Sequence, residues 1–233
     1  MKALLLSAGF GTRLQPITDI IPKVLVPING KPLLEYWLEN LSKAGVKQFL
    51  INTHYLSKKI ERFVSNSKFK DSITLMHEKE LLLTGGTILK NRDFFQDEPF
   101  FVVHADNLCF CDFNEFIKAH KNRPKETIIT MMLFYSDNPS NCGIVKIKDK
   151  IVIDFFEKVK NPPSNLANGA VYIFEKEIFN VLKEFKKEKI DLSLEVIPRL
   201  KNRIFTYVNN IYLRDIGTVE NYALAQVEIL EYL

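Results

Sequence analysis

The first residues of the chain constrain its fold most strongly. An apolar run, Ala3 to Leu6, is typical of a buried strand in a parallel sheet. It ends at a glycine-containing turn, Ser7-Ala8-Gly9-Phe10-Gly11-Thr12-Arg13. Small residues let the backbone approach a ligand closely, and the exposed N–H groups of such a turn form an anion-binding nest. Arg13 and Lys23 add two cations at the same end of the strand, so the segment predicts a polyphosphate-binding loop.

The turn does not match the two best-known phosphate loops. The dinucleotide fingerprint G-x-G-x-x-G needs a third glycine, and Leu14 stands at that position. No Gly-Lys-Ser/Thr follows either, so the turn is not a P-loop.

The rest of the chain alternates apolar strands with amphipathic helices, which predicts βαβ units on a parallel sheet. From residue 127 the strands follow one another with few helices between them, so we expect a mixed sheet there. The predicted strands span 3–6, 49–52, 73–76, 100–103, 127–134, 144–147, 151–155, 170–174 and 204–208. The predicted helices span 32–44, 57–65, 85–91, 112–120, 177–185, 192–200 and 218–230.

Composition excludes several classes of protein. With 32 basic and 28 acidic residues the net charge is +4, too small to indicate nucleic-acid binding, although it suits an anionic substrate. No run of about 18 apolar residues exists, and only four follow Lys2, so we expect neither a membrane span nor a signal peptide. Cys109, Cys111 and Cys142 lack zinc-site spacing, which favours reduced thiols and a cytoplasmic location.

Two later segments are candidates for ligand contacts. Thr84-Gly85-Gly86-Thr87 forms a strand-to-helix turn after Glu80, where main-chain groups could read a flat base or simply make the turn. Asp106 follows a buried strand at the edge where ligands of open α/β sheets collect. Its carboxylate could hold a magnesium ion on a triphosphate, or only cap a helix or form a turn.

The second half of the chain holds three more polar segments. Glu157-Lys158 precedes a proline-containing loop, and Asn168-Gly169 precedes an apolar strand. Asp215 stands three residues before Thr218, which can cap the last helix. Alone, each is compatible with an ordinary solvated edge or a helix cap.

Together the motifs resemble those of sugar-1-phosphate nucleotidyltransferases, also called nucleotide-sugar pyrophosphorylases. The resemblance rests first on Gly9-x-Gly11-Thr12-Arg13-Leu14-x-Pro16-x-Thr18-x-x-x-Pro22-Lys23-x-Leu25-x-Pro27. With this first motif included, five motifs occur between Lys2 and Thr218 in the same order as in the family. Several positions depart from the family pattern: Leu83 for the first Gly of Leu-Gly-Thr-Ala-Gly, Gly85 for its Ala, Ala105 for Gly, Val159 for Pro, and Gly169 one place early in Asn-Ala-Gly.

The resemblance implies a Rossmann-like three-layer α/β fold with a mostly parallel mixed central sheet, of the nucleotide-diphospho-sugar transferase type. It implies one catalytic domain over residues 1–233, with a nucleotide-binding half at about 1–110 and a sugar-binding half at about 111–233. Because the sequence ends soon after Thr218, we expect no left-handed β-helix of the kind found in bifunctional and glucose-1-phosphate relatives.

Site roles carry over by matching positions. Arg13 and Lys23 would be catalytic, and Asp106 and Asp215 would hold Mg²⁺. The nucleotide would be bound by Ser7, Ala8, Gly9, Gly11, Thr12, Arg13, Glu80, Thr84, Gly85, Gly86 and Asp106. The sugar phosphate would be bound by Gly143, Glu157, Lys158, Asn168 and Gly169.

The implied reaction joins an NTP and a sugar 1-phosphate to give an NDP-sugar and pyrophosphate. The pattern looks most like mannose- and heptose-1-phosphate guanylyltransferases, which favours GTP with a manno-configured hexose or heptose 1-phosphate, for glycan or capsule precursors. A cytidylyltransferase of a phosphorylated alcohol such as phosphocholine, and a non-catalytic regulatory subunit, are the alternatives. The sequence predicts no nucleic-acid or membrane partner, and it leaves a homo-oligomer open.

Overall fold

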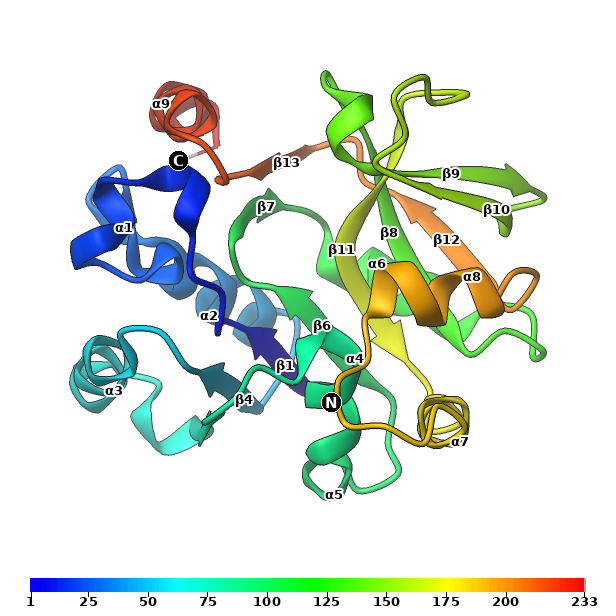
Figure 1. Cartoon of the computed structure of the whole chain (residues 1–233), viewed down its shortest axis with the longest axis horizontal. Coiled ribbons are helices and arrows are strands. Elements are labelled where there is room, and N and C mark those ends of the chain that lie inside the picture. Colours follow the sequence, from blue (N-terminus) through cyan, green and yellow to red (C-terminus); the bar gives the residue numbers. More distant parts are fainter. Residues whose placement is uncertain (233) are drawn as a thin grey trace. The chain divides into compact units, whose positions relative to one another are not determined.

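A computed structural model describes residues 1–232, and Figure 1 labels its helices and strands. The chain divides into two compact units. Unit 1 comprises Met1–Leu81, Val103–Cys111 and Ile211–Leu233; unit 2 comprises Leu82–Val102 and Asp112–Asn210. The strand β6 (Phe100–His104) begins in unit 2 and ends in unit 1. Two segments therefore group differently from the predicted halves: residues 82–102 belong to unit 2, and the C-terminal residues belong to unit 1.

Unit 1 contains a parallel sheet in the order β5-β4-β1, with Leu4 opposite Leu50 and Leu50 opposite Thr74. The apolar run at the N-terminus becomes β1 because Ala3, Leu4 and Leu5 are completely buried. The strands of unit 1 are β1 (Lys2–Leu6), β2 (Pro27–Ile28), β3 (Lys31–Pro32), β4 (Gln48–Thr53), β5 (Ile73–His77), β7 (Asn107–Phe110) and β13 (Tyr212–Asp215). Its helices are α1 (Ile17–Ile20), α2 (Leu33–Lys43), α3 (Ser57–Asn66) and α9 (Val219–Glu228).

Helix α2 shows how sequence spacing gives packing. Leu34, Trp37, Leu38 and Leu41 recur at helical spacing and are buried, so the helix presents one apolar face to the core. The Trp37 indole donates a hydrogen bond to the backbone carbonyl of Asn107 at 2.7 Å, which fixes the start of β7 against this helix.

Unit 2 contains a mixed sheet in the order β11-β8-β12-β10-β9, in which only β8 and β12 pair in parallel. Its strands are β8 (Ile129–Tyr135), β9 (Gly143–Lys148), β10 (Ile151–Glu157), β11 (Leu166–Phe174) and β12 (Ile204–Val208). Its helices are α4 (Leu83–Lys90), α5 (Arg92–Phe95), α6 (Phe113–Lys121), α7 (Ile178–Lys183) and α8 (Ile197–Arg199).

The α/β class with a mixed sheet is confirmed. The helix predicted at 112–120 is present as α6, and Asp112 caps its first turn, because the Glu115 backbone N–H donates to Asp112 Oδ1 at 3.0 Å. The predicted helix at 192–200 is instead a π-helix, Leu192–Val196, followed by the short α8. The strands β7 and β13 were not predicted from the sequence, and they pair antiparallel as a two-stranded ribbon.

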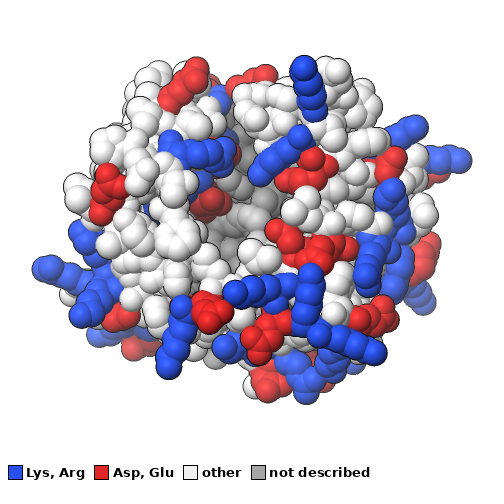
Figure 2. All heavy atoms as spheres, viewed as in Figure 1, with Lys and Arg blue, Asp and Glu red and all other residues white. Residues whose placement is uncertain are grey.

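No helix among the described residues is long and apolar enough to cross a membrane. Basic and acidic side chains are interleaved over the face drawn in Figure 2. That mixture is unlike the one-sided basic stripe of a nucleic-acid-binding surface.

Candidate functional site

The glycine-containing turn after β1 has open backbone donors. Within residues 1–232, the N–H groups of residues 8 to 12 have no hydrogen-bond partner. The turn itself is held from both ends: the Ser7 N–H donates to Asn52 Oδ1 at 2.8 Å, and the Thr18 hydroxyl donates to the Gly11 carbonyl at 2.8 Å. Gly11 has φ +68°, and a Cβ there would lie 2.9 Å from the Thr18 methyl carbon. A fixed loop with several open N–H groups is suited to bind an anion.

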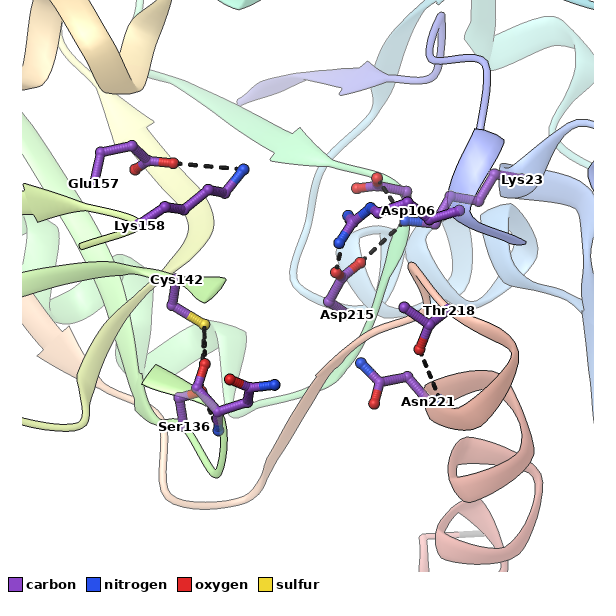
Figure 3. A network of polar contacts seen from close by, with 11 residues as sticks. Lys23, Asp106, Ser136, Cys142, Glu157, Lys158, Asp215, Thr218 and Asn221 are labelled. Atoms are coloured by element: carbon purple, nitrogen blue, oxygen red, sulfur yellow. Dashed lines mark hydrogen bonds and ion pairs between the residues drawn. The ribbon is translucent and has the colours of Figure 1, made fainter. Parts of the chain in front are cut away.

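Two carboxylates meet at one ammonium group in the same unit. The Lys23 Nζ lies 2.8 Å from Asp106 Oδ2 and 3.0 Å from Asp215 Oδ1 (Figure 3). An Arg13 guanidinium nitrogen lies 3.5 Å from the other oxygen of Asp215. We call these four residues the aspartate cluster. The Lys23 side chain is only 8% exposed, whereas those of Asp106 and Asp215 are about two-fifths exposed.

The β7–β13 ribbon brings the two aspartates together. Asp215 pairs with Asn107 in the ribbon, and the Ile216 N–H donates to the Asp106 carbonyl at 3.3 Å. Asp106 does not cap a helix, which was one of the alternatives for it, because β7 follows it directly. Strand pairing thus joins two residues that lie more than a hundred positions apart in the sequence.

One hydrophobic cluster anchors the segments that carry these charges. Leu14, Leu108 and Ile216 are completely buried in it together with Ala225 and Ile229 of the C-terminal helical segment. Leu14 follows Arg13, and Ile216 follows Asp215, so burial of each apolar neighbour places the adjacent charge at the surface of the core.

Gly217 leaves room for the ion pair of Asp215 and Arg13. A Cβ at this position would lie 2.5 Å from Asp215 Oδ2 and 2.9 Å from the Arg13 guanidinium. Any larger residue would therefore push the carboxylate or the guanidinium away.

The charges of the cluster stabilise one another. Burial alone would lower the pKa of Lys23, but the carboxylates of Asp106 and Asp215 outweigh it and raise that pKa above its ordinary value. Burial would raise the pKa of Asp106, and the charges of Lys23 and His104 outweigh burial and lower it. Ammonium and carboxylate therefore stay charged together at neutral pH.

The donor set fits a magnesium ion held jointly with a phosphate ligand. Mg²⁺ prefers hard oxygen donors and is usually bound by one or two carboxylates plus phosphate oxygens and water. Asp106 and Asp215 supply two such groups, both already within reach of a single cationic atom. The described residues contain no cluster of three or more His, Cys, Asp or Glu that could hold a metal by itself.

A second group of predicted residues lies in unit 2, on β9, β10 and β11. Gly143 faces Glu157 across β9 and β10. A Cβ on Gly143 would lie 2.6 Å from Glu157 Oε2 and 2.5 Å from the Phe155 ring, so glycine clears the space that the carboxylate occupies. The Lys158 ammonium lies 3.7 Å from Glu157 Oε1 (Figure 3). Burial, opposed by Lys158 and assisted by Asp191, raises the pKa of Glu157.

Asn168 occupies a bulge of β11. Its side-chain N–H donates to the Tyr172 hydroxyl at 2.7 Å, and its Oδ1 accepts from the Ala170 N–H at 3.0 Å. The pairing of β11 with β8 shifts register between Asn168 and Tyr172, and Gly169 lies buried within the shift. We call Gly143, Glu157, Lys158 and Asn168 the hairpin group.

A family model described as nucleotidyl transferase matches residues 2–232. The chain belongs to the nucleotidyl transferase family. This confirms the family resemblance predicted from the motifs.

Individual relatives of this nucleotidyl transferase are similar over long stretches. Mannose-1-phosphate guanylyltransferase catalytic subunit beta of Danio rerio is 35% identical over 205 residues, which are 79% of this chain and 56% of that protein. D-glycero-alpha-D-manno-heptose 1-phosphate guanylyltransferase of Aneurinibacillus thermoaerophilus is 30% identical over 235 residues and is matched over its full length. The crystal structure of HddC from Yersinia pseudotuberculosis complexed with GMP-PN has a TM-score of 0.82 at 26% identity, and covers 98% of this chain and 99% of that one.

The predicted base-reading turn is built differently from our expectation. The N–H groups of Gly85 and Gly86 both donate to the Ile190 carbonyl, at 2.8 and 3.2 Å, and the Thr84 hydroxyl accepts from the Leu192 N–H at 2.8 Å. A Cβ on Gly86 would lie 2.1 Å from the Glu188 carbonyl oxygen. These two glycines therefore allow close approach of the transferase's own chain, and their amide groups are not open to a base.

Two departures from the family pattern fall where the backbone favours glycine. Leu83 has φ +63° and Ala170 has φ +54°. Both stand where the family has glycine, so here a residue with a Cβ adopts the left-handed conformation. Glu80 is exposed in the segment between β5 and α4.

Two buried polar residues that support the turn after β1 were not predicted from the sequence. Asn52 at the end of β4 donates to Glu78 Oε1 at 2.9 Å while its Oδ1 accepts from Ser7. Asn52 and Glu78 are 3% and 1% exposed. The sequence feature that could have indicated them is a polar residue at or just after the end of an apolar strand. Asn52 lies near the end of β4, which pairs with β1, and Glu78 directly follows β5, which pairs with β4.

Proposed function

We propose that this transferase joins a nucleoside triphosphate and a sugar 1-phosphate to give a nucleotide-sugar and pyrophosphate. The observation that carries the proposal is the aspartate cluster beside a loop with open N–H groups. That arrangement supplies both kinds of group that a triphosphate needs, which are donors for its oxygens and carboxylates for its metal ion.

The turn after β1 and the residues of the aspartate cluster each have a defined part in the proposed reaction. The N–H groups of residues 8 to 12 and the Arg13 guanidinium bind the β- and γ-phosphates, and Lys23 neutralises charge that develops at the α-phosphate. Asp106 and Asp215 would hold Mg²⁺, which when bound screens the repulsion between two anionic reactants and stabilises the leaving pyrophosphate.

The chemistry requires no general base. A phosphate oxygen of the sugar 1-phosphate forms the new bond to the α-phosphorus, and the bond from that phosphorus to the bridging oxygen of the β-phosphate breaks. Pyrophosphate leaves with the electron pair, and no proton is transferred because the attacking oxygen is already ionised. Positioning and charge neutralisation therefore supply most of the rate enhancement.

The hairpin group would bind the sugar. Glu157 is an acceptor for sugar hydroxyls, and Asn168 is oriented by Tyr172 and the Ala170 N–H. Carboxylates and amides are suitable partners for hydroxyl groups because they form directional hydrogen bonds. Lys158, with its side chain 63% exposed, would meet the phosphate of the sugar.

We further propose GTP and a manno-configured hexose or heptose 1-phosphate as substrates, in the supply of glycan or capsule precursors in the cytoplasm. The printed names of the Danio rerio and Aneurinibacillus thermoaerophilus relatives support this choice, as does the GMP-PN complex of HddC. The presence of every charged residue of the aspartate cluster disfavours a non-catalytic subunit.

A substrate panel tests the proposal directly. Four NTPs are combined with mannose, heptose, glucose and N-acetylglucosamine 1-phosphates and with phosphocholine, and pyrophosphate release is measured in the presence of Mg²⁺. We expect the largest kcat/KM for GTP with a manno-configured sugar phosphate, and a loss of at least about a hundredfold in turnover for Arg13→Ala and for Lys23→Ala. Absence of pyrophosphate release from every pair contradicts the proposal, and preference for CTP with phosphocholine selects the alternative enzyme class.

A further inference from the structure

The aspartate pair of this protein already holds a cation, which belongs to the chain itself. The Lys23 ammonium contacts one oxygen of Asp106 and one of Asp215, at 2.8 and 3.0 Å. These are the same two carboxylates that would ligate Mg²⁺ in the proposed function. Two cations cannot share the space between them, because each would repel the other at that separation.

Lys23 is held firmly in this position. Its stem leaves a 3₁₀ turn, Lys23–Leu25, whose three residues are all buried, and its Cβ lies close to where a Gly11 side chain would stand. Only 8% of the side chain is exposed, so little water can reach the ammonium to accept its hydrogen bonds in place of the carboxylates. Lys23 therefore leaves the aspartates only for another anion.

The charge balance of the cluster favours a triphosphate as that anion. Lys23 and Arg13 carry two positive charges, and Asp106 and Asp215 carry two negative ones, so the cluster is neutral as it stands. A divalent metal ion alone would leave an excess of positive charge beside two cations. A metal ion together with a triphosphate gives the aspartates a new cationic partner and gives Lys23 and Arg13 phosphate oxygens as new anionic partners, so no cation is left facing only other cations.

We propose that Lys23 fills the metal position in the free protein. The divalent ion then binds the two aspartates only together with the triphosphate, whose oxygens replace the aspartates as the partners of Lys23. This inference rests on the proposed function. It makes the metal ion and the nucleotide mutually dependent ligands, each raising the affinity of the protein for the other.

Manganese binding without any substrate tests the inference. Mn²⁺ alone is titrated into the full chain, and unbound Mn²⁺ is followed by electron paramagnetic resonance. We expect the native protein and Lys23→Arg, which keeps the charge, to bind Mn²⁺ weakly. Lys23→Met, which keeps most of the stem without the charge, should bind at least about tenfold more tightly, because the competing cation is gone. The double variant Lys23→Met with Asp215→Asn should lose that gain.

A second variant and a second measurement guard against misfolding. Lys23→Gln can still donate hydrogen bonds to both carboxylates, and should also gain affinity for Mn²⁺. Mn²⁺ should raise the Tm of the two neutral variants and leave that of the native protein unchanged, because a ligand stabilises only the folded state that binds it.

Two results overturn the inference. One is Mn²⁺ binding by the native protein as tight as by Lys23→Met; the other is no gain in either neutral variant. Neither result depends on turnover, whereas failure of the proposed function would show as absence of pyrophosphate release in the substrate panel. The two failures are therefore distinguishable.

Discussion

The aspartate cluster and the hairpin group are built on opposite principles. The cluster joins four charged residues from three distant parts of the sequence, and each charge is compensated by another. The hairpin group uses neighbouring strands, with a glycine that clears space for one carboxylate and an asparagine oriented by hydrogen bonds. Asp149 and Lys150, which connect β9 to β10, both have positive φ, as a tight two-residue hairpin turn requires.

The difference fits two kinds of ligand. Compensated charges are suited to a highly charged ligand, because the pairs can exchange partners without leaving a buried charge unpaired. A partly buried carboxylate with a raised pKa is suited to neutral hydroxyl groups, which satisfy it without adding charge. The comparison can be tested region by region.

The largest effect is expected from the carboxylates of the cluster. Asp106→Asn and Asp215→Asn keep the shape of each side chain and remove one negative charge, so turnover should fall at least about a hundredfold in each. Pyrophosphate release measures the loss, and thermal melting verifies the fold. Asp154→Asn is the matched control, since Asp154 is an aspartate of β10 paired with Lys201 outside both regions. Turnover close to that of the native enzyme in both cluster variants would remove them from the reaction.

The next effect separates a glycine required by the fold from one required by a ligand. Gly143→Ala places a methyl group against Phe155 and Glu157, and should lower the free energy of unfolding by about 1–3 kcal/mol. Gly9→Ala meets no atom within 4 Å, and should leave stability nearly unchanged. Urea unfolding measures both. Nucleotide affinity should fall in Gly9→Ala, because the new methyl group enters the space where phosphates would approach the loop. Equal stability of the two variants would contradict the packing argument at Gly143.

Glu157→Gln tests the hairpin group. Loss of a charged acceptor should raise the KM for sugar 1-phosphate about tenfold and change the KM for the nucleotide little. Steady-state kinetics with each substrate varied in turn measures the split. A similar rise in both KM values would place Glu157 outside sugar binding.

The same variant has a signature in pH. Because the pKa of Glu157 is raised on folding, the folded protein binds more protons than the unfolded chain between the two pKa values. The free energy of unfolding from this group therefore falls as pH rises through that window, and Glu157→Gln should flatten the fall. Urea unfolding at a series of pH values above the ordinary glutamate pKa measures it.

The smallest effect concerns the two residues that replace family glycines. Leu83→Gly and Ala170→Gly relieve a left-handed conformation and should each raise the free energy of unfolding by up to about 1 kcal/mol. Ala223→Gly, at an exposed position within α9, is the control of opposite sign and should lower it by about 1 kcal/mol. Destabilisation by all three substitutions would show that Leu83 and Ala170 contribute more through contacts than they lose through backbone strain.

Sequence reasoning succeeded where a pattern is local. The spacing of the apolar residues in α2 and the apolar run of β1 predicted both elements, because burial of a regular face depends on neighbours in the sequence. The helix at 112–120 was predicted for the same reason. The short strands of the ribbon were missed because four residues such as Asn107–Phe110 carry too little periodicity to identify a strand.

The sequence by itself determined the α/β class, the family and the residue types available for chemistry. Only the tertiary structure decided which of them meet. Lys23, Asp106 and Asp215 converge because β13 pairs with β7 and one hydrophobic cluster holds the flanking residues. The N–H groups of Gly85 and Gly86 donate to the Ile190 carbonyl because the segment around Ile190 packs against these glycines. Both outcomes depend on contacts between residues about a hundred or more positions apart, whose formation is set by packing of the whole unit rather than by any local pattern.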